Sequence, residues 1–402
     1  MHVIVLGAGV VGVTTAYYLS QLGCKVTVVD RASEAGHGAT FANAGQLSYS
    51  FTDALAKPEF LARIPGMVLG RDRGVRVRLS PKLIAWGTRF LGQCTTEHAQ
   101  QNTLAVLKAA MRSAELMTEL REELPFNFWH RTAGKLVLLS DEEELAGARK
   151  SMELKRTHGC DTTVLTRAEA LAVEPALEQV REEIAGAVYS KSDEVADSLK
   201  FVAGMRSWLE EQGNVEFRLS SQVRKLLVRN GKTHAVEVDG DTLEADAFVV
   251  CMGAWSHEIL RTVGINASVY PVRGYSLTLP PGDAAPTVSV TALKHRMVYS
   301  RINGFVRIAG FADFTGYNAS ADDKRAKLLL ELAKNYAPDA ADYDAEDPMV
   351  WGGFRPMTPS GRPQVGPTKI DGLFVNTGHG MLGWTLACGT SYDAAQAVAR
   401  VH

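Results

Sequence analysis

The sequence predicts an α/β protein, α+β overall, with a Rossmann-type dinucleotide-binding domain and a second domain built on an antiparallel sheet. Three features carry this prediction. A hydrophobic strand enters the glycine turn of Gly7, Gly9 and Gly12, and a later strand enters a similar turn at 251–255. Between 267 and 310, strand-like runs follow one another without intervening helices, which is typical of an antiparallel sheet.

The first glycine turn indicates the class of ligand. Gly7 allows the tight turn after the strand, Gly9 lets the backbone approach a pyrophosphate, and Gly12 lets the next helix pack on the sheet. The phosphates would lie at the helix N-terminus, where free N–H groups favour negative charge. Asp30 ends the second strand, where a carboxylate would bind a ribose hydroxyl and repel a 2′-phosphate. We expect an adenosine dinucleotide without that phosphate.

Hydrophobic periodicity predicts the elements of the first half of the chain. A helix over 10–22 stops at Gly23, and a strand over 25–30 follows it. The loop over 35–46 is too rich in small residues to be core, so we expect its backbone to pack around a ligand. The other elements expected here are helices over 97–124 and 197–212 and strands over 132–139, 215–228, 235–238 and 247–250.

The second half continues with the run of strands and then returns to the first domain. Strands are expected over 268–272, 275–279, 287–290, 297–300 and 305–308, then a helix over 322–336, a strand over 373–375, a glycine loop over 376–384 and a closing helix. The dinucleotide-binding domain would therefore be discontinuous, comprising 1–60, 196–262 and 350–402, with a substrate domain at 61–195 and 263–349. A cleft between two such domains is a common place for a small-molecule site.

Composition narrows the class of protein. A chain of 402 residues exceeds what one core usually serves, and the net charge of −2 offers no basis for binding nucleic acid. No long apolar run predicts a membrane span. The first strand begins at His2, which leaves no room for a signal peptide, so we expect a cytoplasmic protein. Five scattered cysteines indicate reduced thiols, with no spacing for a metal site.

Longer motifs add a resemblance that covers the chain from end to end. They are LGAGVVGVTTAYYLSQLGCKVTVVDR, FANAGQLS, YPVRGYSLTLP, GFRPMTPSGRPQVG and NTGHGMLGWTLACG. The chain resembles the D-amino acid oxidase and glycine oxidase-like family of FAD-dependent oxidoreductases, which includes D-amino acid dehydrogenases. The resemblance implies amino acid catabolism: FAD accepts a hydride from Cα at flavin N5, D-amino acids are deaminated, and electrons pass to a quinone or respiratory-chain acceptor.

The resemblance also implies the FAD-binding residues. They are Gly7, Gly9, Val10, Val11, Gly12, Asp30, Arg31, Asn43, Ala44, Gly45, Gln46, Val223, Gly253, Gly378, His379, Gly380, Met381 and Gly383. Relatives that attach FAD covalently carry a histidine where this chain has Ala42, or a cysteine where it has Met357 and Thr358. We therefore expect noncovalent FAD.

Three residues are predicted to act on the substrate. Arg355 lies where the family places its carboxylate-binding arginine, and its rigid donor fork matches two carboxylate oxygens. Tyr275 would supply a hydroxyl to the carboxylate, although packing is the more common role of a strand tyrosine. His379 would tune the flavin or position the substrate. Arg273 either flanks the substrate or is an exposed strand arginine, and Tyr299 and Tyr317 are expected to pack.

The segment 57–89 carries eight basic residues against two acidic ones, a net +6. Its aliphatic residues and Trp86 would complete a peripheral contact with the inner face of the cell membrane. The alternative is a solvated basic loop packed on the FAD domain.

The sequence is also compatible with other functions. The same fold could oxidise a secondary amine such as hydroxyproline, proline, sarcosine or glycine, as a dehydrogenase or an oxygen-using oxidase. A nicotinamide-dependent dehydrogenase would leave the C-terminal flavin loop without a purpose. A third possibility is an electron-transfer subunit of a larger complex.

Overall fold

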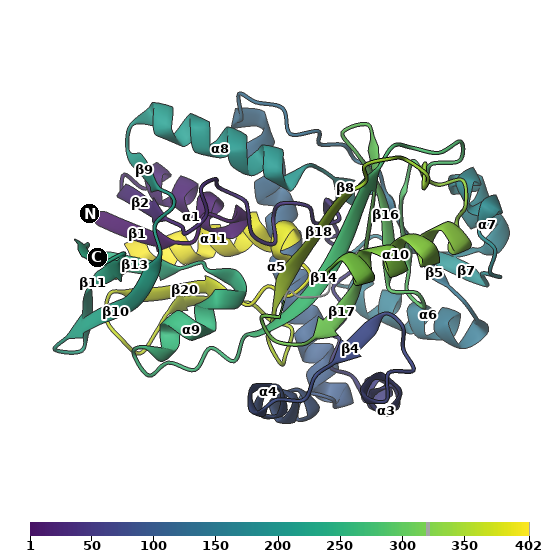
Figure 1. Cartoon of the computed structure of the whole chain (residues 1–402), viewed down its shortest axis with the longest axis horizontal. Helices are drawn as coiled ribbons and strands as arrows, with labels where there is room; N and C mark the ends of the chain where they lie inside the picture. The colour runs from purple at the N-terminus through teal and green to yellow at the C-terminus, as the bar shows by residue number, and fades with distance from the viewer. Residues whose placement is uncertain (319–321, 402) are drawn as a thin grey trace.

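The computed structural model describes residues 1–318 and 322–401, which form two large sheets (Figure 1). The first sheet has the strand order β19-β20-β13-β1-β2-β9. Its strands are β1 (His2–Leu6), β2 (Lys25–Val29), β9 (Val215–Arg218), β13 (Ala247–Val250), β19 (Gln364–Pro367) and β20 (Leu373–Thr377). All neighbours are parallel except β19 and β20. The predicted Rossmann-type arrangement is confirmed.

Both faces of this sheet are buried, as expected for parallel strands. Val3 and Val5 of β1 pack under helices, whereas Ile4 and Leu6 pack against a β-meander on the other face. The helical layer contains α1 (Val10–Gln21), α5 (Thr96–Glu123), α8 (Ser198–Gln212) and α11 (Gly383–Ala399). The opposite layer contains β10 (Val223–Arg229), β11 (Lys232–Val238), β12 (Asp241–Glu244) and α9 (Ser256–Arg261), which follows the short helix η2 (Gly253–Trp255).

The second sheet has the order β18-β14-β17-β16-β15-β5-β7-β6, with β4 added beside β17. Its strands are β4 (Val75–Val77), β5 (Lys135–Leu139), β6 (Thr163–Thr166), β7 (Gly186–Ser190), β14 (Tyr270–Leu279), β15 (Ser289–Ala292), β16 (Met297–Ile302), β17 (Phe305–Phe314) and β18 (Met349–Met357). Most neighbours are antiparallel, as predicted, but β15 pairs parallel with β5 and β17 with β4. One face packs on α7 (Arg167–Val173), η1 (Pro175–Gln179) and α10 (Asp322–Tyr336), and Figure 1 shows α10 crossing it.

The remaining elements connect the two sheets. They are β3 (Gln46–Leu47), α2 (Pro58–Leu61), α3 (Ile64–Val68), α4 (Pro81–Leu91), α6 (Glu142–Arg156) and β8 (Glu194–Val195). Helix α4 is amphipathic, and its residues Leu83, Trp86 and Phe90 pack against Tyr270 and Val272 of β14. Among the described residues, no helix is both long and apolar enough to cross a membrane.

The strands predicted at 268–272 and 275–279 are one continuous strand, β14, because Gly274 does not turn the chain and stays paired with Gly353. Helix α5 lies within the predicted substrate domain, yet Val106 and Ala110 pack in the core of the first sheet. The domain boundaries stay a prediction.

Candidate active site

One cavity of about 2280 Å³ is lined by residues of both sheets. Every site residue predicted from the sequence lines it except Gly12 and Gly378. The folded chain therefore brings together the glycine turn, the loop over 43–46, the C-terminal glycine loop and Arg355, which lie far apart in the sequence.

The glycine turn at the end of β1 has the shape that a dinucleotide needs. Gly7 has φ +108°, and a Cβ there would lie 2.6 Å from the carbonyl oxygen of Cys251. A Cβ on Gly12 would lie 1.8 Å from the carbonyl oxygen of Gly7, so this glycine is required for helix and strand to meet. At Gly9 the nearest atom is the Thr40 hydroxyl at 3.6 Å, which leaves open space toward the cavity. These residues fit a pyrophosphate at Gly9.

The carboxylate of Asp30 ties this turn to the end of β2. It accepts hydrogen bonds from the amides of Ala8 at 2.7 Å and Ala32 at 2.8 Å. Each oxygen keeps a further lone pair, so the predicted ribose contact remains sterically and chemically available. Thr40, which the sequence did not single out, accepts from the amide of Val10 at 3.0 Å and orders the start of α1.

A stack of flat groups flanks the second glycine turn. The guanidinium of Arg31 lies 4.1 Å from the centroid of Trp255, and the ring of Tyr317 stacks on Trp255 at 4.0 Å. The Tyr317 hydroxyl also donates to the carbonyl of Ala254 at 2.7 Å. Tyr317 is therefore a packing residue, and it connects the loop after β17 to the turn that contains Gly253.

The loop over 35–46, which is predicted to pack around a ligand, crosses the second sheet and is fixed to three of its strands. The Ser276 hydroxyl of β14 donates to the carbonyl of Ala42, and Arg307 of β17 donates to the carbonyl of Asn43. Further along, the side-chain amide of Gln46 donates to Ser289 of β15. These contacts hold the backbone over 42–46 rigidly, as a flavin-binding loop requires.

Lys135 of β5 makes a further contact between the second sheet and this loop, and it was not predicted from the sequence as a site residue. Its ammonium donates to the side chains of Gln46 at 3.1 Å and Ser48 at 2.9 Å, and it lies 4.2 Å from the centroid of Phe51. Burial lowers the pKa of Lys135 to about 8. The only sequence signal was a lysine opening an otherwise apolar strand.

Arg355 presents a cation on the cavity wall. Its guanidinium lies across β14 above Gly274, where a Cβ would come within 2.4 Å of Nη2, and Nη1 donates to the carbonyl of Phe311. No carboxylate among the described residues lies within ion-pair distance of it. Burial lowers the pKa of Arg355 to about 10, whereas the charge of Asp313 opposes this shift. At neutral pH Arg355 therefore stays charged, with donors available to a ligand.

The polar groups of the other candidate substrate residues are bound within the protein. The hydroxyl of Tyr275 donates to Asp313 at 3.0 Å, although part of the residue lines the cavity, and its predicted role stays a prediction. Arg273 is buried and paired with Asp322, so neither proposed role, substrate contact or exposure, is correct. Tyr299 is packed, and its hydroxyl donates to the carbonyl of Ala333.

His379 lies in the C-terminal glycine loop with its side chain turned inward. Its Nε2 lies 3.0 Å from the Thr390 hydroxyl on α11, and only 3% of its surface is exposed. Burial lowers the pKa of His379 to about 4, so the imidazole is neutral at physiological pH. A neutral, hydrogen-bonded ring can position the loop amides but offers no positive charge to a ligand.

This burial predicts a specific pH dependence of stability. The unfolded histidine titrates near pH 6.5, so between pH 6.5 and 4 the unfolded state binds more protons than the folded state. Stability should therefore fall as the pH drops through this window, by up to roughly 3 kcal/mol from this group alone. Urea unfolding of wild type and His379→Gln at pH 4.5 and 7.5 measures it. The decrease in the free energy of unfolding between pH 7.5 and 4.5 should be smaller in the variant. Equal decreases in both proteins would exclude His379 as the cause.

Comparison with known proteins agrees with this arrangement. The family model described as FAD dependent oxidoreductase matches residues 2–397. A D-amino acid dehydrogenase 2 of Ralstonia nicotianae is 38% identical, over 100% of this chain and 97% of that protein. L-Proline dehydrogenase from P. horikoshii has a TM-score of 0.77 at 18% identity, covering 99% of this chain and 93% of that one. Glycine oxidase from Geobacillus kaustophilus has a TM-score of 0.75 at 24% identity, covering 99% and 94%. The chain belongs to the family of FAD dependent oxidoreductases.

Proposed function

We propose that this protein is an FAD-dependent amino acid dehydrogenase that deaminates D-amino acids, with Arg355 binding the α-carboxylate. The observation that carries the proposal is a half-buried arginine, on the wall of the same cavity as the glycine turn, that pairs with no carboxylate among the described residues. The curated relative at 38% identity is named for D-amino acids, which favours this substrate class.

The protein's own residues would bind and orient the reactants. FAD supplies the acceptor for the hydride that leaves Cα, and no strong base is then needed. Arg355 would hold the carboxylate, so that Cα faces the flavin at near-attack distance. The amides of the loop containing His379 and Gly380 would donate to the pyrimidine end of the flavin. The imino acid product would be hydrolysed by water to an oxo acid and ammonia.

The substrate side chain would lie on an apolar part of the cavity floor. Three neighbouring strands line it: β16 with Val298, β15 with Thr291, and β5 with Val137 and Leu139. Thr291 is the one polar side chain of this group, and its hydroxyl has no hydrogen-bond partner. We expect apolar side chains to be accepted there, because Val298, Val137 and Leu139 offer no partner for a polar or charged group.

A substrate panel tests the proposal. Purified holoenzyme is assayed by dye reduction with D- and L-amino acids and with proline, hydroxyproline, sarcosine and glycine, while oxygen consumption is measured in parallel. Turnover of D-amino acids with little oxygen uptake supports the proposal. Preference for a secondary amine would favour the alternative substrate class, and a colourless protein that turns over nicotinamide would overturn it. Absence of any turnover by the lone chain would favour an electron-transfer subunit.

We propose further that the chain acts as the small subunit of such a dehydrogenase and passes its electrons to a quinone or another respiratory-chain acceptor. Reduction of a quinone analogue by the substrate-reduced protein, faster than reduction of oxygen, would support this acceptor. Faster reaction with oxygen would mark the protein as an oxidase.

We expect FAD to be released intact by acid precipitation. Ala42 has no nucleophile, and the Thr358 hydroxyl donates to the carbonyl of Arg362. Burial raises the pKa of Cys251, a cysteine that lines the cavity, to about 12, so its thiol is unreactive at neutral pH. The absorbance of supernatant and pellet measures the release. Flavin retained in the washed pellet would reveal a covalent bond.

We propose that 57–89 contacts an anionic membrane surface at the inner face of the cell membrane. Its exposed aliphatic side chains lie beside exposed basic ones; they are Leu61, Val68, Leu69, Leu79 and Ile84, with Lys57, Arg63, Arg71, Arg73, Arg78, Lys82 and Arg89. Helices α3 and α4 and strand β4 lie together at one edge of the molecule (Figure 1). The prediction that Trp86 contributes to the membrane contact is wrong, because Trp86 is buried and its indole N–H donates to the carbonyl of Met357.

Charge reversal at this edge should weaken vesicle binding strongly. Arg76 pairs with the buried Asp313 and must stay, so Arg71→Glu and Arg78→Glu are combined. Each basic residue near the surface contributes about 1 kcal/mol, so reversal of two should weaken binding at least 30-fold at low salt. Cosedimentation with phosphatidylglycerol vesicles measures this. Reversal of exposed Lys191 and Arg229 is the matched control. Equal binding by both variants would exclude the contact.

A further inference from the structure

Strand β17 carries a strained residue directly beside Arg355. Strands β14 and β17 pair at Arg273 with Asp313 and at Tyr275 with Gly310, so a single residue of β14 faces two residues of β17. Phe311, the first of these two, has φ +64°, a left-handed conformation that a bulky side chain rarely adopts. Such strain persists only where the surroundings impose it, and it is frequent at functional sites.

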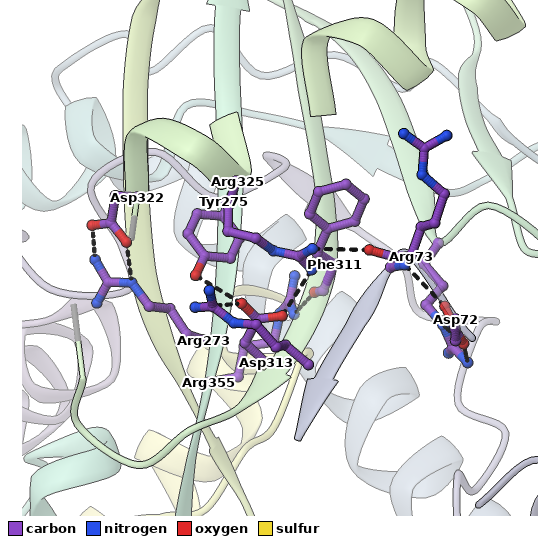
Figure 2. Close-up of polar contacts among 12 residues, drawn as sticks. Asp72, Arg73, Arg273, Tyr275, Phe311, Asp313, Asp322, Arg325 and Arg355 are labelled. Atoms are coloured by element: carbon purple, nitrogen blue, oxygen red, sulfur yellow. Dashed lines mark hydrogen bonds and ion pairs between the residues drawn. The ribbon is translucent and has the colours of Figure 1, made fainter. Parts of the chain in front are cut away.

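The bulge determines where the Phe311 carbonyl points. That carbonyl accepts a hydrogen bond from Nη1 of Arg355 (Figure 2). The guanidinium of Arg355 lies flat above Gly274. The flexible side chain of Arg355 is therefore held at two points. The carbonyl of Phe311 binds one edge of the guanidinium, and the backbone of Gly274 lies beneath its plane. The orientation of the remaining donors of Arg355 follows from the geometry of the bulge.

A buried charge cluster lies against the strained residue. The carboxylate of Asp313 is fully buried and accepts from Arg325 at 2.8 Å, Tyr275 at 3.0 Å and Arg76 at 3.2 Å. The guanidinium carbon of Arg325 also lies 4.2 Å from the centroid of the Phe311 ring. Figure 2 shows Arg325 and Asp313 lying between Phe311 and Tyr275.

Arg325 connects this cluster to two further parts of the chain. It lies on α10, and its Nη1 donates to the carbonyl of Arg73 at 2.9 Å. Its flat face covers the Phe311 ring, a contact that is favourable between a cation and an aromatic face. Neither Arg325 nor Asp313 is among the described residues that line the cavity. Their influence on a ligand must therefore pass through Phe311 and Arg355.

We propose that Arg325 and Asp313 are positioning residues that hold the strained Phe311 bulge and thereby orient Arg355 toward an anionic group in the cavity. The proposal rests on the proposed function only in taking that anion to be the substrate carboxylate. Arg325 packs on the Phe311 ring and Asp313 keeps Arg325 in place, so the carbonyl of Phe311 stays directed at Nη1 of Arg355. Without the cluster, the bulge would relax and the guanidinium would turn.

The test measures carboxylate binding to the holoenzyme, with benzoate as the probe and the flavin absorbance and titration calorimetry as readouts. Arg325→Met should raise the Kd for benzoate on the order of 10- to 100-fold, because a displacement of about 1 Å at a site can cost that much. The Kd for FAD should stay within twofold of wild type, since the glycine turn is untouched. Lys327→Met, an exposed change on the same helix, is the matched control and should alter neither constant.

Two further variants separate positioning from folding. Arg325→Lys keeps a charge beside Asp313 but loses the flat face and the second donor, so it should fold and still raise the benzoate Kd severalfold. In an Arg355→Lys background, Arg325→Met should add little, since no guanidinium is left to orient. Unchanged benzoate binding in the folded variants would overturn the proposal. It would also be overturned if the losses of benzoate affinity caused by Arg325→Met and Arg355→Lys were fully additive in the double variant. If D-amino acids are not oxidised while benzoate binding responds as expected, the proposed substrate fails and the positioning role stands.

Discussion

Replacement of Arg355 by alanine should leave the protein yellow but raise the KM for D-amino acids about 30-fold to several hundred-fold. The variant loses charge-assisted, bidentate hydrogen bonds to the α-carboxylate, which contribute on the order of 2 to 4 kcal/mol. FAD should stay bound because Arg355 lies on β18, in the sheet that does not contain the glycine turn. Steady-state kinetics with a dye acceptor, together with the visible spectrum, measure both quantities.

Arg355→Lys is the matched variant for this experiment. Lysine keeps the charge but offers a point donor in place of the planar fork, so it should recover only part of the lost affinity. It also cannot occupy both the Phe311 carbonyl and a carboxylate with the same geometry. An unchanged KM in the alanine variant would remove Arg355 from the substrate site.

Replacement of Gly9 by alanine should impair FAD binding without unfolding the protein. The backbone of Gly9 has φ −73°, which alanine adopts freely, and the added Cβ meets only the Thr40 hydroxyl at 3.6 Å. A pyrophosphate at the start of α1 would collide with the new methyl group. Overpacking of this kind costs about 1–3 kcal/mol, or roughly 5- to 150-fold in the Kd for FAD. Titration of apoprotein with FAD measures it, and thermal unfolding of the apoprotein should be unchanged.

Gly12→Ala provides the contrast. Its Cβ would lie 1.8 Å from the carbonyl oxygen of Gly7, so the helix and the strand must separate. We expect destabilisation of the apoprotein itself, toward the upper end of the roughly 1–3 kcal/mol typical of overpacking. If Gly9→Ala bound FAD as tightly as wild type, the pyrophosphate would have to lie elsewhere in the cavity.

The dinucleotide half of the site could be predicted from the sequence because its determinants are local. Gly7, Gly9 and Gly12 lie within one turn between β1 and α1, and the closest contact of Gly12 is with the carbonyl of Gly7 in the same turn. Asp30 ends the next strand, and parallel pairing brings it back to the same turn through the amide of Ala8. Spacing along the chain was sufficient to specify these positions.

The substrate half depends on strand register, which spacing alone does not specify. Arg273 and Arg355 both lie on neighbouring strands, but Arg273 pairs with Phe354 and Val272 pairs with Arg355. Alternate residues of a strand point to opposite faces, so Arg355 faces the cavity and Arg273 faces Asp322. In helix α4, too, spacing alone does not specify which residues are buried. Packing against β14 buries Trp86 and leaves Ile84 exposed.

By itself the sequence determined the Rossmann-type turn, the class of cofactor and the presence of an arginine beside Pro356. Only the tertiary structure decided that Arg355 lines the cavity while Arg273 pairs with Asp322, how the loop over 42–46 is held by neighbouring strands, and that Phe311 adopts a left-handed conformation. The physical reason is that each of these depends on partners contributed by distant segments. A bulge in β17 arises from its pairing with β14 and from Arg325 on α10, contacts that no local pattern of residues encodes.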